Sequence, residues 1–67
     1  MRMDSTTLQH LVDSGIVEVR DLNGNLATVD RAMNAPLCFQ VHAMSGLVFH
    51  VMYNNRADKF KLTEVPQ

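Results

Sequence analysis

The sequence is poor in the residue types that most often reveal a protein's chemistry. Its 67 residues include one cysteine, Cys38, one tyrosine and no tryptophan. A single cysteine excludes a disulfide within the chain, and a lone thiol is typical of a reducing compartment. The sequence also lacks a secretory signal pattern. We therefore expect a cytoplasmic protein.

An excess of one charge is also lacking. Six Lys and Arg oppose seven Asp and Glu, which gives a formal net charge of −1. Proteins that hold nucleic acid mainly through its phosphates usually carry a clear basic excess, so this class is disfavoured, although a local basic patch stays open. No apolar run approaches the ~20 residues of a membrane-spanning helix, so we expect no membrane partner.

The length allows a single domain, residues 1–67. Hydrophobic residues make up 46% of the chain, which is too many for a disordered segment. A domain of this size buries only about 60% of the surface of its unfolded chain, and such small folds often gain stability from a metal or a partner subunit. We therefore expect one folded domain that forms a homo-oligomer, most simply a homodimer.

The beginning of the chain predicts a short helix from Thr6 to Asp13, after a frayed start at residues 1–4. Three residues are suited to cap its N-terminus: Asp4, Ser5 and Thr6. Its apolar stripe follows helical spacing and consists of Leu8, Leu11 and Val12. Gly15 stands where a helix-ending glycine belongs. So short a helix is not stable alone in water, and we expect it to pack on a sheet.

Two hairpins are predicted next by alternating apolar and polar residues. In the first, the loop is at residues 22–24, Val19 pairs with Ala27, and the second strand of the hairpin extends to Val29. Residues 30–35 are predicted to form a connector. The second joins residues 37–43 to residues 47–53 through a loop that ends in glycine. Its register sets four apolar pairs opposite each other: Leu37 with Tyr53, Phe39 with Val51, Val41 with Phe49, and Ala43 with Leu47.

A last strand at residues 59–63 completes the predicted architecture. The fold class is a small α+β domain, mainly β. A short N-terminal helix precedes a five-stranded antiparallel meander, which is either open or curled into a small barrel.

The outer face of the second hairpin is unusually free of charge for a solvated sheet face. Burial would stabilise Val48 and Met52 by roughly 1.5–3 kcal/mol each. Because one short helix cannot cover both faces of a sheet, either sheet curvature or a partner must cover these side chains. The predicted partner-binding residues are Cys38, His42, Val48, His50 and Met52.

The number and spacing of the cysteine and histidine side chains disfavour both metal binding and catalysis. Sulfur and imidazole are ligands for zinc or copper, and Cys38, His42 and His50 share the outer face, but only His10 is left as a fourth ligand. Cys38 and His42 are also about 13 Å apart at a rise of ~3.3 Å per residue, too far for a nucleophile and its base. We assign no catalytic residue, metal or cofactor, and expect a protein that is not an enzyme.

A few residues resemble the Sm-like family of small barrels. The order of the elements is similar, and the segment Asp30–Asn34 resembles the Asp-x-x-Met-Asn box of its first signature. The resemblance implies a ring-forming module that binds RNA, with Asn34 in a base-contacting loop and Arg56 near the same pore. The second strand is shorter than in the family, and Tyr53–Arg56 replaces the Arg-Gly of its second signature.

Three functions remain at this stage. The first is a small regulatory protein, an inhibitor or adapter, that docks on another protein through the apolar sheet face. The second is an Sm-like oligomeric RNA-binding module, in which basic residues hold phosphates and the nearby aromatic rings of Tyr53 and Phe60 stack on bases. Its residues would be Asn34, Arg56, Lys59 and Lys61. The third is a small metal-binding domain.

Overall fold

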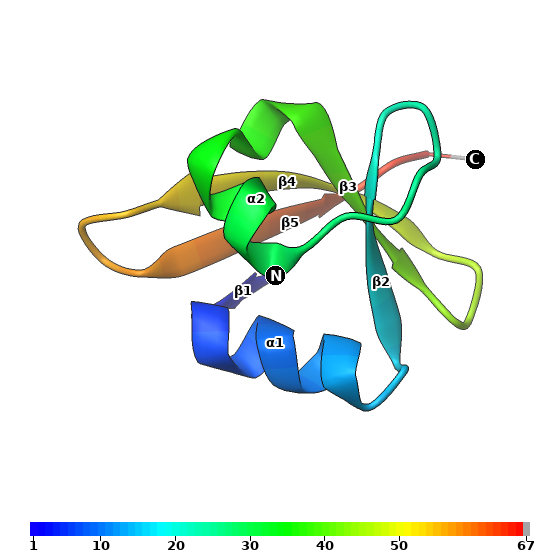
Figure 1. Ribbon diagram of the computed structural model, residues 1–67, viewed down its shortest axis with the longest axis horizontal. Helices are drawn as coiled ribbons and strands as arrows, with labels where there is room; N and C mark the ends of the chain where they lie inside the picture. The colour runs from blue at the N-terminus through cyan, green and yellow to red at the C-terminus, as the bar shows by residue number, and fades with distance from the viewer. Residues whose placement is uncertain (67) are drawn as a thin grey trace.

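The computed structural model, which describes residues 1–66, is a five-stranded antiparallel sheet with two helices packed on one of its faces (Figure 1). The strand order is β1-β5-β4-β3-β2, and the sheet is open, with β1 and β2 at its edges. The predicted fold class is confirmed, and the barrel alternative is not adopted. The elements are β1 Arg2–Met3, α1 Ser5–Asp13, β2 Val17–Asp21, α2 Val29–Asn34, the 3₁₀ helix η1 Pro36–Cys38, β3 Phe39–Ala43, β4 Val48–Asn54 and β5 Lys59–Glu64.

Helix α1 forms where the sequence predicts it, one residue earlier. Its N-cap is Asp4, whose Oδ1 accepts a hydrogen bond from the backbone N–H of Thr7 at 2.7 Å. At the other end, Gly15 adopts φ 76°. The N–H groups of Gly15 and Ile16 then bond to the carbonyls of Val12 and Leu11, which closes the helix by a Schellman motif.

The central hairpin of β3 and β4 has the predicted register. Val41 lies opposite Phe49, and the loop closes at Gly46 with φ 97°. The prediction was wrong, however, for the start of the first strand. Residues 36–38 form η1, because Pro36 favours the first turn of a helix and the N–H of Cys38 bonds to the carbonyl of Ala35.

The predicted strand at residues 27–29 and the connector at residues 30–35 are wrong. The hairpin register itself is correct, since Arg20 bridges Leu26, but pairing stops there. Helix α2 begins at Val29, and the Thr28 hydroxyl caps it by accepting a hydrogen bond from the N–H of Arg31 at 3.1 Å. Because no strand forms at residues 27–29, β2 pairs directly with β3.

The expectation of a frayed N-terminus is also wrong. Arg2 and Met3 form β1, which pairs with Lys61 and Phe60 of β5. The amino group of Met1 donates to the carbonyl of Leu62 at 3.0 Å. The sheet has five strands as predicted, but β1 replaces the expected strand at residues 27–29.

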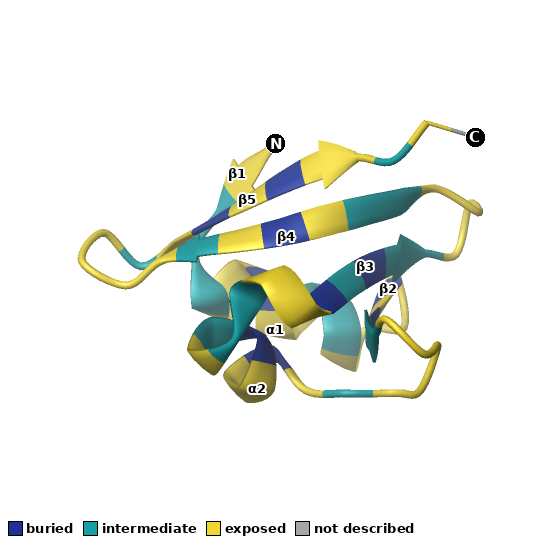
Figure 2. Ribbon diagram, turned by 90° about the horizontal axis from the view of Figure 1, so that it is seen from above, coloured by how far each residue is buried: buried dark blue, intermediate teal, exposed yellow. Residues whose placement is uncertain are grey.

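The core lies between the sheet and the two helices. Figure 2 shows the helices beneath one face of the sheet and nothing above the other. The buried side chains all belong to this layer: Leu8, Val17, Val19, Val29, Ala32, Phe39, Val41, Val51, Phe60 and Leu62. Within residues 1–66, no helix has the length and apolar character needed to cross a membrane.

Candidate functional site

One face of the sheet carries no helix and is left uncovered by the fold (Figure 2). Cross-strand partners point to the same face, so the pairing registers identify its members. We call this surface the open face. Its residues are Arg2, Glu18, Arg20, Gln40, His42, Val48, His50, Met52, Asn54, Lys59, Lys61 and Thr63.

Four of the five predicted partner-binding residues lie on the open face. His42 and Val48 are opposite each other and half-buried, whereas His50 is exposed and Met52 is 53% exposed. Cys38 does not join them, because it lies in η1, outside the paired strands, where its side chain is exposed. The fold therefore leaves Met52 exposed and covers Val48 only in part.

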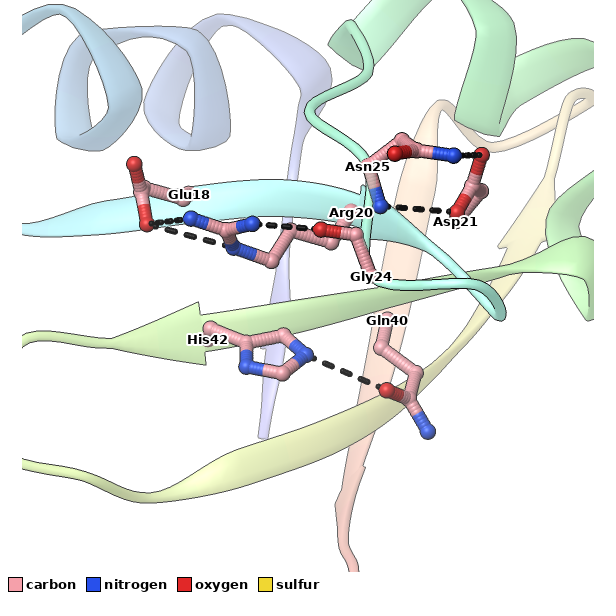
Figure 3. A network of polar contacts seen from close by, with 7 residues as sticks. All are labelled: Glu18, Arg20, Asp21, Gly24, Asn25, Gln40 and His42. Carbon is pink, nitrogen blue, oxygen red and sulfur yellow. Dashed lines mark hydrogen bonds and ion pairs between the residues drawn. The ribbon is translucent and has the colours of Figure 1, made fainter.

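The β2 side of the open face is internally neutralised. Glu18 Oε1 accepts a hydrogen bond from Arg20 Nη2 at 2.9 Å, and Arg20 Nη1 donates to the carbonyl of Gly24 (Figure 3). On the neighbouring strand, His42 Nε2 lies 3.1 Å from Gln40 Oε1. The polar groups at this end are thus fixed in place by one another.

The β5 side of the open face is basic. The side chains of Arg2 and Lys61 belong to directly opposed residues, and Met52 lies opposite Lys61 on the other side. These residues and Lys59 line a shallow hollow of about 280 Å³. In the part of the chain that the structure describes, none of the three cations forms an ion pair with a carboxylate.

Formal charge is distributed unequally between the open face and the rest of the molecule. The open face has four cationic side chains and one carboxylate, a formal charge of +3. The remainder has two cations and six carboxylates, a formal charge of −4, which together give the net −1 of the sequence. The near-neutral total therefore hides a basic surface. Composition alone missed it, although the alternation of Lys59 and Lys61 with Phe60 was a usable signal.

The residues predicted to bind nucleic acid are not brought together. Asn34 ends α2 in the helix layer, where its Nδ2 donates to the carbonyl of Asp30 at 3.1 Å. Arg56 lies in the turn between β4 and β5, and only Lys59 and Lys61 are on the open face.

The expected aromatic stacking on bases is not available at Phe60. This side chain is completely buried, and the ring of Tyr53 packs on it with a centroid distance of 4.5 Å. Both rings belong to the helix side of the sheet, because Tyr53 and Phe60 are opposed to each other and alternate with open-face residues.

A hydrogen-bond cluster ties the β4–β5 turn to helix α1. Tyr53 Oη donates to Asp58 Oδ1 at 2.7 Å, and the N–H of Ser5 donates to the same oxygen at 3.4 Å. These bonds favour the charged carboxylate, so the pKa of Asp58 lies below its ordinary value, with the Tyr53 hydroxyl as the main cause. The same bond raises the pKa of Tyr53. The cluster holds the turn that precedes Lys59.

Metal-binding residues are dispersed. Among residues 1–66, no group of three or more His, Cys, Asp or Glu side chains is placed to hold a metal ion. His42 and His50 are on the open face, but Cys38 is in η1 and His10 is on α1.

Comparison of the chain with protein-family models, with curated protein sequences and with solved structures finds no match. The resemblance to Sm-like proteins stays a prediction.

Proposed function

We propose that this protein is a non-enzymatic regulatory or adapter module that docks on an acidic surface of another protein through the open face. The observation that supports the proposal is the basic group of Arg2, Lys59 and Lys61, which form no ion pair with a carboxylate of residues 1–66, around the exposed Met52 on a face that no helix covers. A cytoplasmic location belongs to the same proposal.

The apolar part of the open face would supply the affinity. Val48 and Met52 lie on the central strand of the face, two rows apart. Burial of such a side chain from full exposure is worth about 1.5–3 kcal/mol, and a partner would supply only the part that is still exposed, about half for Met52 and less for the half-buried Val48. Charged groups at the rim chiefly set partner choice and association rate. An acidic partner with an apolar centre therefore matches the open face.

A different protein suits this surface better than a second copy does. Two open faces pressed together would each bring a formal charge of +3 to the interface, and like charges across an interface are costly. The predicted homodimer would have to avoid that contact. RNA is the other acidic partner, but single-stranded RNA is usually held by stacking on aromatic rings, and among residues 1–66 the open face has no Phe, Tyr or Trp side chain and only the imidazoles of His42 and His50.

The test compares the wild-type chain with a double variant, Val48→Lys with Met52→Lys. Both proteins are immobilised and used to isolate binding proteins from a cell extract that has been treated with nuclease. A third protein, Thr6→Lys, adds a lysine to the exposed side of α1 and serves as the matched control. We expect a partner retained by wild type and Thr6→Lys, whose affinity for the double variant is at least tenfold lower, with all three proteins equally folded by circular dichroism.

Two outcomes would contradict the proposal. Equal loss in the Thr6→Lys control would mean that the open face does not carry the binding. Nuclease treatment that abolishes binding, together with a steep fall of affinity with salt, would instead support RNA as the partner. Light scattering on the free wild-type protein, before it is immobilised, gives its mass and therefore tests the predicted homodimer.

A further inference from the structure

Three exposed cations lie together on the β5 side of the open face. Arg2 of β1 is directly opposite Lys61 of β5, and Lys59 is two residues before Lys61 on the same strand. Residues opposite each other on one face have Cβ atoms about 4.5–5.5 Å apart. A rise of ~3.3 Å per residue places Lys59 about 6.6 Å from Lys61 along β5. The three side chains can therefore reach the same small ligand.

This grouping of charge is unfavourable in the free protein. Like charges on directly opposed residues destabilise a sheet, and Arg2 and Lys61 form such a pair. No carboxylate in the described part of the chain forms an ion pair with either of them or with Lys59. Lys59 does help to lower the pKa of Asp4, but the main cause there is the hydrogen bond from Thr7. An anion held among the three cations would relieve their repulsion.

A hollow of about 280 Å³ lies between these side chains, and Met52 and Asn54 also line it. The Oδ1 atom of Asn54 accepts hydrogen bonds from the backbone N–H groups of Arg56 at 3.1 Å and Ala57 at 3.3 Å. These bonds fix the side-chain amide, and its NH₂ group is left as a neutral donor beside the cations. The hollow thus combines charged and neutral donors with one apolar wall, the exposed side chain of Met52.

We propose that this hollow binds the phosphate monoester of a phosphorylated serine or threonine in the partner protein, an inference that rests on the docking function proposed above. Such a group carries a charge of about −1.5 to −2 and three acceptor oxygens. The guanidinium of Arg2 can donate two parallel hydrogen bonds to two of these oxygens. Lys59 and Lys61 supply further positive charge, as basic clusters do in other proteins that recognise phosphorylated segments.

Other anions match the hollow less well. A carboxylate carries a single negative charge, so two or three acidic side chains would have to converge on a volume of about 280 Å³ and would repel one another. A phosphodiester of nucleic acid also carries only one charge. The apolar wall at Met52 favours an uncharged residue next to the phosphorylated one in the partner.

Titration of the free protein with methyl phosphate, followed by the backbone amide resonances, provides the first test. At about pH 7.5 this monoester is largely a dianion, because its second pKa is about 6. We expect saturable shifts at Arg2, Lys59 and Lys61, with dimethyl phosphate and acetate binding at least tenfold more weakly at the same ionic strength. Arg2→Gln should also weaken binding of methyl phosphate at least tenfold.

The matched control is Arg31→Gln, which removes the same charge from α2, on the other side of the sheet. It should leave the affinity for methyl phosphate unchanged. The proposal is wrong if no saturable shift occurs at the three cations, or if Arg31→Gln weakens binding as much as Arg2→Gln does. Equal affinity for dimethyl phosphate would also overturn it and would support a nucleic acid ligand instead.

Phosphatase treatment of the nuclease-treated extract separates this proposal from the docking function. A partner retained through the open face should lose at least tenfold in affinity after the treatment, relative to a mock-treated extract. If the affinity is unchanged by phosphatase but is still lost in the double variant Val48→Lys with Met52→Lys, the phosphate proposal is wrong and the docking function stands. If no partner is retained through the open face, the docking function itself is wrong, whatever methyl phosphate does.

Discussion

The two faces of a single strand differ sharply in how far their side chains are buried. On β5, Phe60 and Leu62 are buried, whereas Lys59 and Lys61, their direct neighbours, are exposed. On β4, Val51 is 1% exposed and Met52 is 53% exposed. Both faces carry apolar side chains, but only one is covered by α1 and α2. Hydrophobicity alone therefore does not define the core here, because the position of the helices decides which apolar residues are withdrawn from water.

The difference also separates stability from binding. Side chains under the helices contribute their transfer free energy to folding of the isolated chain. Met52, which is 53% exposed, and the half-buried Val48 contribute only part of theirs. A charged, fully polar face would have been the ordinary alternative for a sheet exposed on one side. Matched substitutions on the two faces test this difference, and the largest effects are expected in the layer that the helices cover.

The largest expected effect is on folding. Phe60→Ala should reduce the free energy of unfolding by about 3–5 kcal/mol, because it opens a cavity in a fully buried position. Met52→Ala, on the neighbouring strand but on the opposite face of the sheet, should change that free energy by no more than about 0.5 kcal/mol. Urea unfolding followed by circular dichroism measures both. Similar losses for the two variants would show that the open face is as well packed as the core.

Charge reversal on the open face should act on binding and leave the fold intact. Lys59→Glu combined with Lys61→Glu should lower the affinity for the acidic partner at least tenfold, about 1.4 kcal/mol, and flatten its dependence on salt. Thr6→Glu, on α1, is the control for added negative charge. Titration calorimetry at low and moderate salt measures the change. An affinity that Thr6→Glu lowers equally would contradict a role specific to the basic side.

Acid should destabilise the protein through the cluster that joins the β4–β5 turn to α1. The pKa of Asp58 lies below its ordinary value of 3.8 in the folded chain because Tyr53 and Ser5 donate to its carboxylate. Its contribution to stability is therefore complete above that value and is lost as pH falls towards the lowered pKa. The melting temperature of Asp58→Asn should fall less steeply than that of wild type below about pH 4. Parallel curves would refute the assignment to Asp58.

The smallest effect concerns β4 alone. Val48→Thr should change the free energy of unfolding by no more than about 0.5 kcal/mol, because its position on the open face is half-buried. Val51→Thr places a hydroxyl in the core of the same strand and should cost about 1–3 kcal/mol. Thermal melts of the two variants compare the two faces of β4 with the same substitution, valine to threonine. If Val48→Thr is the more harmful change, the open face is covered in solution.

Local signals in the sequence are sufficient to predict some of the elements. The cap at Asp4 and the glycine after α1 delimit the helix, and one apolar alternation on each side of Gly46 specifies the β3–β4 register. Four of the five predicted partner-binding residues followed from that register. Their exposure did not follow, because exposure depends on which face the helices cover.

The remaining elements depend on contacts between segments that are distant in the sequence. Val29 fits both a strand alternation and a helical stripe with Ala32 and Met33, and packing of that stripe on the sheet selects the helix. A two-residue strand such as β1 has no local signal, since its pairs with β5 are almost a chain length away. That same long-range pairing brings Arg2 beside Lys61 and creates the basic side of the open face. Short-range sequence patterns determine the local backbone conformation and which side chains share a face of a strand or helix. Contacts between distant segments depend instead on the arrangement that buries the most apolar surface.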